Sequence, residues 1–390
     1  MKRRVILFLC IAVLMLMLVP TINISLNQPL KTSGDAKQMH WWSRANLYRL
    51  DFLMPWLARL AYPFGISISP TQVVIGRDGW LYLGDKYAQG ISLKRHPAST
   101  DDLARIERID TATRAWKDWF ESQGVRLYRI QLVPDKNSVY PEFLPVWAQP
   151  VPDHATNRLR ERVSPAIYVD NRPALLEAKA TLGQPLYYRT DSHWNAAGAW
   201  IGYRDLAETI RISNSDIQWL TLDQVRLSAM EGRLGMDLGS FLWMGSVLND
   251  TEISIDIDRS LPTEQTDFES GERSRLSSNP RISAPQRPLL VRSPNALNQA
   301  RLLWFRDSFG TAMTPLMAAT FSETLQVNYG LHDPEQIARL VRDFKPDYVI
   351  VTAIERASLS DWFQQLPPNI PERAVSFQRS ASYDQMANRW

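Results

Sequence analysis

The sequence predicts an α/β protein in which helices cover both faces of a mainly parallel sheet. Apolar runs that fit buried strands occur at residues 125–133, 301–305, 324–329 and 347–352. Stretches with the apolar spacing of helices lie between them, as at residues 334–344. Strands that alternate with helices form parallel sheets, and continuous apolar strands are typical of sheets buried on both faces.

Local signals define several elements along the chain. Residues 73–83 alternate around an Asp-Gly pair, which predicts a β-hairpin. Ser99 is a candidate N-cap for a helix over residues 101–123. Asn195 is a candidate N-cap for a second helix, which continues to Ile210. A short strand at residues 186–188 is expected to lead into the loop before that helix.

The N-terminus carries a membrane-targeting pattern. Lys2-Arg3-Arg4 precedes an unbroken apolar run from Val5 to Val19, and basic residues before an apolar core mark an export signal. No small-residue cleavage site follows, and the apolar segment approaches the ~20 residues of a spanning helix. We expect residues 1–26 to be retained as a signal anchor, with a cleaved signal peptide as the alternative.

The remainder of the chain divides by composition. Residues 27–69 are expected to form a linker and an N-terminal cap, and residues 70–390 a single large domain. Within the first of these, residues 41–62 are aromatic and apolar, which is typical of a segment near a bilayer surface or capping the fold. Residues 251–294 are rich in Ser, Arg, Glu and Pro, which predicts an irregular surface insertion.

Composition also excludes several classes of function. The single cysteine, Cys10, lies inside the apolar N-terminal run, so the exported part has no disulfide, no thiolate nucleophile and no thiolate metal site. The net charge is only +3, from 44 basic and 41 acidic residues. Nucleic acid is therefore a poor candidate partner.

Three side chains are candidates for serine-based acyl transfer. Asp191 and His193 are two residues apart just before a predicted helix, and Ser308 follows a predicted strand at a turn. Ligands of such folds bind at the carboxyl ends of parallel strands, where all three are expected. A serine nucleophile, an imidazole base and an orienting carboxylate are the parts that this chemistry requires.

Other interpretations of the same residues remain open. His193 could be a structural histidine in a turn, and Ser308 a simple helix cap. Asp191 and His193 could bind a metal, although no third His or Cys is nearby in sequence, so no metal site is expected. Four further residues are candidates for a substrate groove, with structural hydrogen bonding as the alternative: Lys136, Tyr140, Tyr329 and Arg356. Asn137, or the backbone at Gly235-Met236-Asp237, is a candidate for completing an oxyanion hole.

Together these motifs resemble the alginate O-acetyltransferase family, the AlgJ/AlgX-like proteins with an SGNH-hydrolase-like domain. The resemblance spans about residues 70–360. It rests on Gly76-Arg77-Asp78-Gly79-Trp80-Leu81-Tyr82, Val133-Pro134-Asp135-Lys136, Tyr140-Pro141-Glu142, Asp191-Ser192-His193-Trp194-Asn195 with Gly198-Ala199, Arg306-Asp307-Ser308-Phe309, and Glu355-Arg356.

The resemblance implies Ser308 as nucleophile, His193 as base and Asp191 as orienting acid, with no cofactor. It also implies a circularly rearranged SGNH topology, because the serine here follows the Asp–His pair in the chain. Arg306 departs from the commoner Gly-Asp-Ser pattern, and a bulky residue there is expected to narrow the turn.

For function, the resemblance implies transfer of an acetyl group through an acetyl-serine onto exopolysaccharide hydroxyls at the periplasmic face of a bacterial inner membrane. A multi-spanning membrane acyltransferase would supply the acetyl group, alongside other exopolysaccharide biosynthesis proteins. A carbohydrate acetyl esterase is the main alternative, since a triad suits either direction. A catalytically silent scaffold of a polysaccharide export complex is the alternative from another class.

Overall fold

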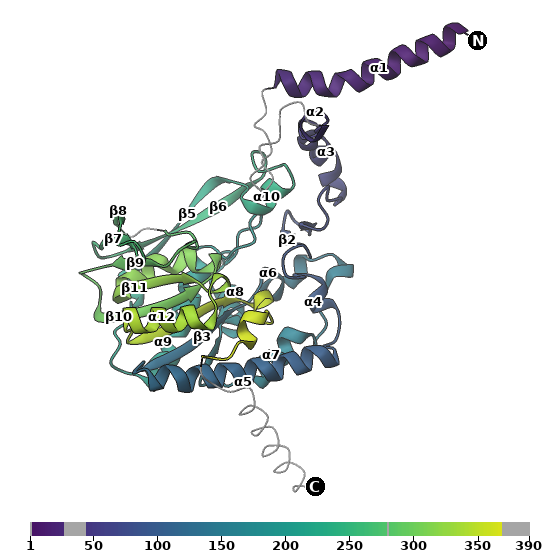
Figure 1. Ribbon diagram of the computed structural model, residues 1–390. Coiled ribbons are helices and arrows are strands. Elements are labelled where there is room, and N and C mark those ends of the chain that lie inside the picture. Colours follow the sequence, from purple (N-terminus) through teal and green to yellow (C-terminus); the bar gives the residue numbers. More distant parts are fainter. Residues whose placement is uncertain (1, 27–43, 279–280, 369–390) are drawn as a thin grey trace, which may run out of the picture.

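An eight-stranded mixed sheet forms the centre of the computed structural model, which describes residues 2–26, 44–278 and 281–368 (Figure 1). The strand order is β4-β3-β12-β10-β11-β9-β7-β8. Neighbours from β4 to β11 pair in parallel, and the pairs from β11 to β8 are antiparallel. The strands are β3 (Leu127–Val133), β4 (Tyr168–Asp170), β7 (Pro262–Asp267), β8 (Arg273–Ser278), β9 (Leu289–Arg292), β10 (Asn298–Arg306), β11 (Phe321–Asn328) and β12 (Tyr348–Ile354).

Helices cover both faces of this sheet, as the sequence predicts. Leu302 and Trp304 of β10 lie in one core cluster with α8, α9 and α11. Leu303 and Phe305 point to the other face and share a cluster with α5, α7 and α12. The helices of the domain are α4 (Ser92–Arg95), α5 (Thr100–Ser122), α6 (Lys136–Val139), α7 (Ala155–Arg162), α8 (Arg172–Thr181), α9 (Ala196–Ser213), α10 (Asp237–Phe241), α11 (Thr314–Thr320) and α12 (Pro334–Phe344). The predicted α/β class is confirmed.

The prediction of an irregular insertion at residues 251–294 is wrong. This stretch contains most of β6 (Asn249–Ile257) and all of β7, β8 and β9. Polar residues such as Thr263 and Gln265 are buried in the ladder between paired strands. A polar composition therefore concealed regular backbone pairing, because threonine and glutamine can fill strand positions when their polar groups are hydrogen-bonded.

Two hairpins lie outside the central sheet. β1 (Val73–Ile75) and β2 (Leu81–Leu83) pair antiparallel, and Asp78 and Gly79 between them both have positive φ, 53° and 77°. Such a turn matches the twist of a two-stranded hairpin, as the Asp-Gly pair predicts. The second hairpin joins β5 (Val225–Leu234) to β6, with α10 in the connection.

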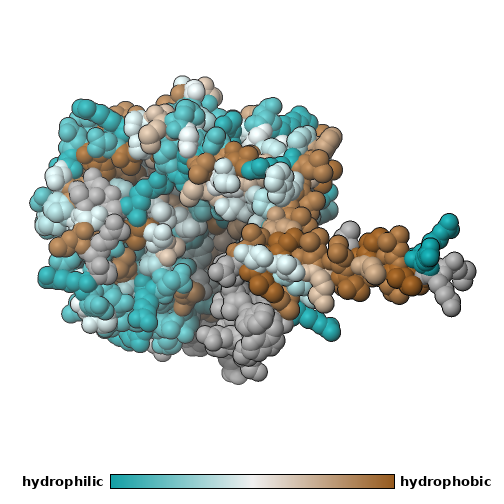
Figure 2. Space-filling view, turned by 90° about the horizontal axis from the view of Figure 1, so that it is seen from above, coloured by the Kyte–Doolittle hydropathy of each residue, from teal (hydrophilic) through white to brown (hydrophobic). Residues whose placement is uncertain are grey.

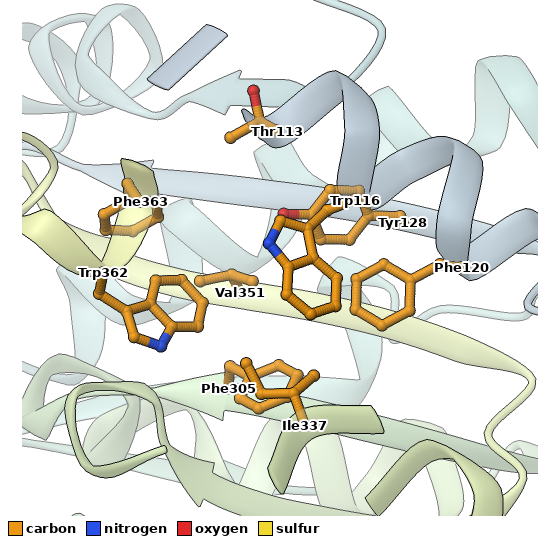
Figure 3. Close-up of a pocket in the computed structure, with 9 residues that line it drawn as sticks. All are labelled: Thr113, Trp116, Phe120, Tyr128, Phe305, Ile337, Val351, Trp362 and Phe363. Carbon is orange, nitrogen blue, oxygen red and sulfur yellow. The ribbon is translucent and has the colours of Figure 1, made fainter. Parts of the chain in front are cut away.

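An aromatic pocket lies between α5, the sheet and the segment near the C-terminal end of the described chain (Figure 3). Nine side chains line it, from Thr113, Trp116, Phe120, Tyr128, Phe305, Ile337, Val351, Trp362 and Phe363. It leaves about 10 Å³ of free space, no more than a single water molecule occupies. It is a packing gap in the core and not a substrate site.

The N-terminal helix α1 (Lys2–Ser25) stands apart from the domain (Figure 1). Its residues Arg3–Ser25 are long and apolar enough to cross a membrane, with a mean hydropathy of 3.0. Near its C-terminal end, Asn23 Nδ2 donates hydrogen bonds to the carbonyl oxygens of Leu47 (2.7 Å) and Arg49 (2.9 Å). This end is thereby joined to α2 (Arg44–Leu47), which precedes α3 (Met54–Ala61). Most of the predicted linker, residues 27–43, lies outside the described residues.

A buried charge cluster holds together the ends of β3 and β12 and the start of α7. Its centre is Glu355, which is fully buried. Lys94 Nζ lies 2.9 Å from Glu355 Oε2, and Arg160 Nη1 lies 2.8 Å from Glu355 Oε1. Burial alone would raise the pKa of Glu355, but Arg160 and Lys94 outweigh it and hold that pKa well below its usual range. Further donors to this carboxylate are Ser138 Oγ, Thr156 Oγ1 and the Asp135 N–H.

Replacing Glu355 by Gln should destabilise the protein strongly, because Lys94 and Arg160 would then be buried beside a neutral amide. Breaking a buried pair in this way lowers the free energy of unfolding by about 3–5 kcal/mol. Chemical denaturation of the detergent-solubilised chain measures the loss. The control Glu142→Gln removes an exposed carboxylate paired with Lys179 at 2.7 Å and should cost less than about 1 kcal/mol. Equal losses for the two variants would contradict this role.

Candidate active site

The turn after β10 presents Ser308 to solvent. Ser308 is exposed and is the first residue of a short 3-10 helix, Ser308–Met313. Asp307 caps this helix: its Oδ1 accepts a hydrogen bond from the Phe309 N–H at 2.8 Å. Its Oδ2 accepts one from the Ile354 N–H at 2.9 Å and one from the Tyr329 hydroxyl at 3.1 Å. One carboxylate therefore fixes the serine turn to the ends of both neighbouring strands.

The loop before α9, which we call the histidine loop (residues 188–195), brings Asp191 and His193 to this serine. His193 Nε2 lies 2.8 Å from Ser308 Oγ, and His193 Nδ1 lies 2.7 Å from Asp191 Oδ1. Asp191 Oδ1 also accepts a hydrogen bond from the His193 N–H at 3.0 Å. The strand predicted at residues 186–188 is reduced to an isolated bridge between Tyr187 and Trp194. The structure thus joins all three predicted side chains in one chain of hydrogen bonds.

The electrostatics of this loop keep Asp191 ionised. Burial disfavours its charge, but the hydrogen bonds and charge of His193, with the attraction of Lys136, outweigh it and lower the pKa of Asp191 to about 2. Lys136 Nζ donates to the carbonyl oxygens of Tyr188, Arg189 and Asp191, the last at 2.7 Å. Burial lowers the pKa of Lys136 to about 8, although Asp237 and Asp191 oppose the shift. Lys136, predicted as a substrate ligand, is instead buried and holds the loop at residues 188–191 in place.

A second carboxylate, that of Asp237, lies beside the imidazole, although only the backbone of this residue was predicted to belong to the site. Its Oδ1 accepts a hydrogen bond from the Ser192 N–H at 2.8 Å, its Oδ2 accepts one from the Ser192 hydroxyl, and Oδ2 lies 3.7 Å from His193 Nδ1. Burial and the charge of Asp191 raise the pKa of Asp237. Asp237 is 44 residues after His193, and the only signal in the sequence is an acidic residue at the position where α10 begins.

The same groups meet the distance requirement for a metal site. Ligand atoms of Asp191, His193 and Asp237 lie within 4.8 Å of one another. In this arrangement His193 Nδ1 is hydrogen-bonded to Asp191 and Nε2 to Ser308, so both ring nitrogens already have partners. The geometry therefore favours the proton-transfer arrangement over metal ligation.

Trp194 joins the histidine loop to the serine turn. Its indole is buried, and Nε1 donates a hydrogen bond to the carbonyl oxygen of Phe309 at 2.9 Å. The indole lies against two glycines of α9, Gly198 and Gly202. A Cβ at Gly202 would lie 2.7 Å from the Trp194 ring, and one at Gly198 would lie 2.9 Å from the Trp194 Cβ. Position 202 requires glycine because the indole occupies the space of a side chain, whereas a Cβ at Gly198 would also lie 2.4 Å from the Leu186 carbonyl oxygen.

Arg306 lies beneath the serine turn and is fully buried. Its guanidinium donates to Gln326 Oε1 and to the carbonyl oxygens of Ile282 and Ser283. Burial without a carboxylate partner lowers its pKa to about 9, against a small opposing effect of Asp307. A Cβ at Gly310 would lie 2.4 Å from the Arg306 Cδ. Arg306 thus fills the space that Gly310 leaves, and it secures the 282–283 segment beside the turn.

The remaining predicted ligands have structural partners. Tyr140 is buried, and its hydroxyl accepts a hydrogen bond from the Leu186 N–H at 2.9 Å. Tyr329 is also buried and donates to Asp307. Arg356 is bonded to the Asp135 carboxylate and lies 5.6 Å from the Phe309 ring centroid. Neither tyrosine is open to a substrate.

Two of the predicted oxyanion donors, the Gly235 N–H and the Asn137 amide, already have partners. The Gly235 N–H donates to the Leu248 carbonyl oxygen at 2.6 Å, which closes the β5–β6 connection. Asn137 is buried; its Nδ2 donates to the Gly90 carbonyl oxygen and its Oδ1 accepts from Lys94. Both predictions fail because these polar groups already satisfy buried backbone and charge partners.

Parts of the chain are similar to known proteins. Residues 73–249 match the family model described as the SGNH hydrolase-like domain of acetyltransferase AlgX. A curated relative, "Probable alginate O-acetylase AlgJ" of Pseudomonas syringae pv. tomato, is 30% identical over 141 residues, which are 35% of this chain and 33% of that protein. The matches support an AlgJ/AlgX-like family. The chain spans about a third of the length of the curated AlgJ relatives first matched.

Solved structures support the same fold. PatB1 of Bacillus cereus superposes with a TM-score of 0.57 at 16% identity, over 75% of this chain and 98% of that one. A DHHW family protein from Eubacterium siraeum gives a TM-score of 0.55 at 16% identity, over 78% and 98%. The predicted SGNH-like α/β fold is confirmed. The AlgX match includes Asp191, His193 and Asp237 but ends before Ser308, so the serine assignment depends on the geometry above.

Replacing Trp194 by Phe should slow modification of Ser308 by a serine-reactive fluorophosphonate. The variant keeps the ring but removes the hydrogen bond to Phe309, and a small displacement of a reacting group costs about ten- to hundredfold in rate. Mass spectrometry of the labelled protein over time measures the rate. The control Trp219→Phe alters a buried indole whose N–H has no hydrogen-bond partner among the described residues. If both variants label at the wild-type rate, the Trp194 bond does not position the serine.

Proposed function

We propose that the protein is an O-acetyltransferase that moves an acetyl group through an acetyl-Ser308 intermediate onto a polysaccharide hydroxyl. The observation that carries this proposal is the position of His193, within hydrogen-bond distance of both Asp191 and Ser308. Relatives named as alginate O-acetylases support the reaction class and an alginate-like polysaccharide as the acceptor.

In the first step, His193 Nε2 takes the proton of Ser308 as Oγ attacks the acetyl carbonyl carbon. The carbonyl oxygen becomes an oxyanion. Ser308 is the first residue of its helix, so its backbone N–H has no acceptor within that helix and is available to bind the oxyanion. Asp191, ionised and bonded to Nδ1, stabilises the imidazolium. His193 returns the proton to the leaving group, and acetyl-Ser308 remains.

In the second step, an acceptor hydroxyl donates its proton to His193 as its oxygen attacks the acetyl-serine carbonyl carbon. The bond to Ser308 Oγ breaks, Oγ regains the proton from His193, and the acetyl ester is now on the sugar. Transfer instead of hydrolysis requires the acceptor to bind beside the ester and exclude water. A carbohydrate acetyl esterase would use the same groups with water as the acceptor.

The proposed location follows from α1. A retained N-terminal anchor would hold the domain at the periplasmic face of a bacterial inner membrane, with the basic residues Arg3 and Arg4 on the cytoplasmic side. That location suits acetyl supply from a multi-spanning membrane acyltransferase and contact with other exopolysaccharide biosynthesis proteins. The anchor is the feature that favours transferase over esterase.

Replacing Asp191 by Asn should reduce turnover by about 10³- to 10⁴-fold, because the imidazole loses its charged acceptor. The pKa of about 2 means that Asp191 is ionised well below neutral pH, so the ratio of wild-type to variant rates should stay constant from about pH 5 to about pH 9. Rates with an activated acetyl ester measure this ratio. A ratio that falls towards one at the acidic end would show that Asp191 is protonated there, against the proposed role.

The direct test of the function is mass spectrometry of products from the full chain in detergent, given an activated acetyl ester and alginate oligosaccharides. Wild type, Ser308→Ala and the control Ser122→Ala, an exposed serine at the end of α5, are compared. Acetylated sugar from wild type and the control, but not from Ser308→Ala, supports the transferase. Free acetate alone points to an esterase. If Ser308→Ala consumes the ester at the wild-type rate, or if the wild type does not consume it, the protein is a silent scaffold.

A further inference from the structure

The short helix α3 presents an unusual apolar surface. Five exposed apolar side chains, which we call the α3 stripe, run from the N-cap of α3 through α3 to the 3-10 helix (Tyr62–Phe64) that follows it: Leu53, Trp56, Leu57, Leu60 and Phe64. Their spacing of three and four residues places them on the same side. Trp56 and Leu60 are each 70% exposed and Phe64 76%. Contiguous apolar surface of this kind marks an interaction site in a soluble domain.

The opposite face of α3 is packed against the domain. Ala58 is buried in a core cluster with Leu238 and Leu242. Both belong to the stretch at residues 236–248 that contains α10, which we call the α10 segment. Tyr62 packs against the same cluster. The stripe therefore does not pack on the domain core, since α3 makes its core contacts with its opposite face. The α10 segment adds exposed apolar side chains of its own: Met236, Trp243 and Val247.

The stripe lies next to the C-terminal end of α1. The Asn23 side chain bonds to the carbonyl oxygens of Leu47 and Arg49, a few residues before α3 begins. Figure 1 shows α1, α2, α3 and α10 at the same end of the molecule, and Figure 2, from above that end, shows hydrophobic residues continuing from α1 onto the domain. The apolar surface is thus continuous with the candidate spanning helix.

We propose that the α3 stripe lies in the lipid–water interface of the membrane that α1 enters. The 23 residues of the apolar span extend about 35 Å as a helix, close to the ~30 Å of a hydrocarbon core. The end of α1 therefore reaches the interface, and α3 follows at that level. The stripe combines Trp, Phe and Leu, and Arg59 lies 5.7 Å from the Trp56 ring centroid. Amphipathic helices that lie on bilayers carry these residue types.

This placement would hold the histidine loop at a fixed height above the lipid. α3 packs on the α10 segment, and Asp237 at the start of α10 accepts a hydrogen bond from the Ser192 N–H, next to His193. Two layers of contact therefore separate the membrane from the imidazole. The consequence for acetyl transfer rests on the proposed function, whereas lipid contact by the stripe does not.

Spin-label accessibility in the full chain tests the proposal. The chain is reconstituted in vesicles of phosphatidylethanolamine and phosphatidylglycerol, and Leu60→Cys and Ile212→Cys are each labelled in a Cys10→Ser background. Ile212 is the matched control, an exposed apolar residue of α9. Oxygen, which concentrates in lipid, and a water-soluble nickel chelate serve as relaxing agents. The label at position 60 should show a ratio of oxygen to nickel accessibility several-fold higher than the label at position 212.

Equal ratios at positions 60 and 212 would overturn the proposal. So would a label at position 60 that neither agent reaches, because a second copy of the chain would then cover the stripe. Cys10, the native cysteine in α1, is labelled in a separate sample. A lipid-exposed label at Cys10 with an aqueous one at position 60 would sustain the anchor and reject the interfacial helix. A lipid-exposed label at position 60 with an aqueous one at Cys10 would sustain the interfacial helix alone.

Discussion

The hydrogen bond from Trp194 to Phe309 is the constraint on which the site depends. The histidine loop does not belong to the central sheet and touches its own neighbours through an isolated bridge. The serine turn, in contrast, is fixed by Asp307 to the ends of both neighbouring strands. A rigid indole packed against Gly202 of α9 links the two through its 2.9 Å hydrogen bond to the Phe309 carbonyl oxygen. The 2.8 Å contact between His193 and Ser308 therefore follows from packing on both sides.

Buried charge supports this arrangement from behind. Lys136 donates hydrogen bonds to the carbonyl oxygens of the loop that carries Asp191, and Glu355 pairs with Lys94 and Arg160 at the ends of β3 and β12. Such groups are costly to bury, and each is satisfied by several partners. The same low-dielectric surroundings strengthen the hydrogen bonds that orient the imidazole. Buried polar contacts thus serve both stability and the geometry of the site, and in the proposed arrangement α3 and α1 connect the site to the membrane.

The sequence predicted the elements with strong local signals and missed what depends on distant contacts. Ser99, Asn195 and the Asp-Gly turn mark their elements at the correct positions because caps and tight turns are local. Ser308 could be proposed because it follows the end of a parallel strand, whereas Asp191 and His193 were proposed from their spacing before a helix, since the strand expected at residues 186–188 is only an isolated bridge. The strands within 251–294 were missed because their burial depends on partners elsewhere in the sheet. Lys136 was assigned to a substrate groove and Asn137 to an oxyanion hole because no local feature shows that a polar side chain is buried.

The central claim is that Ser308 itself carries the acetyl group. Acid quench of the full chain during its first turnover with an activated acetyl ester, followed by peptide mapping, tests this most directly. The acetyl group is expected on the peptide that contains Ser308. It should disappear from this peptide when an acceptor oligosaccharide is added before the quench. Acetyl on another residue, or product formation without any acetylated protein, would contradict it.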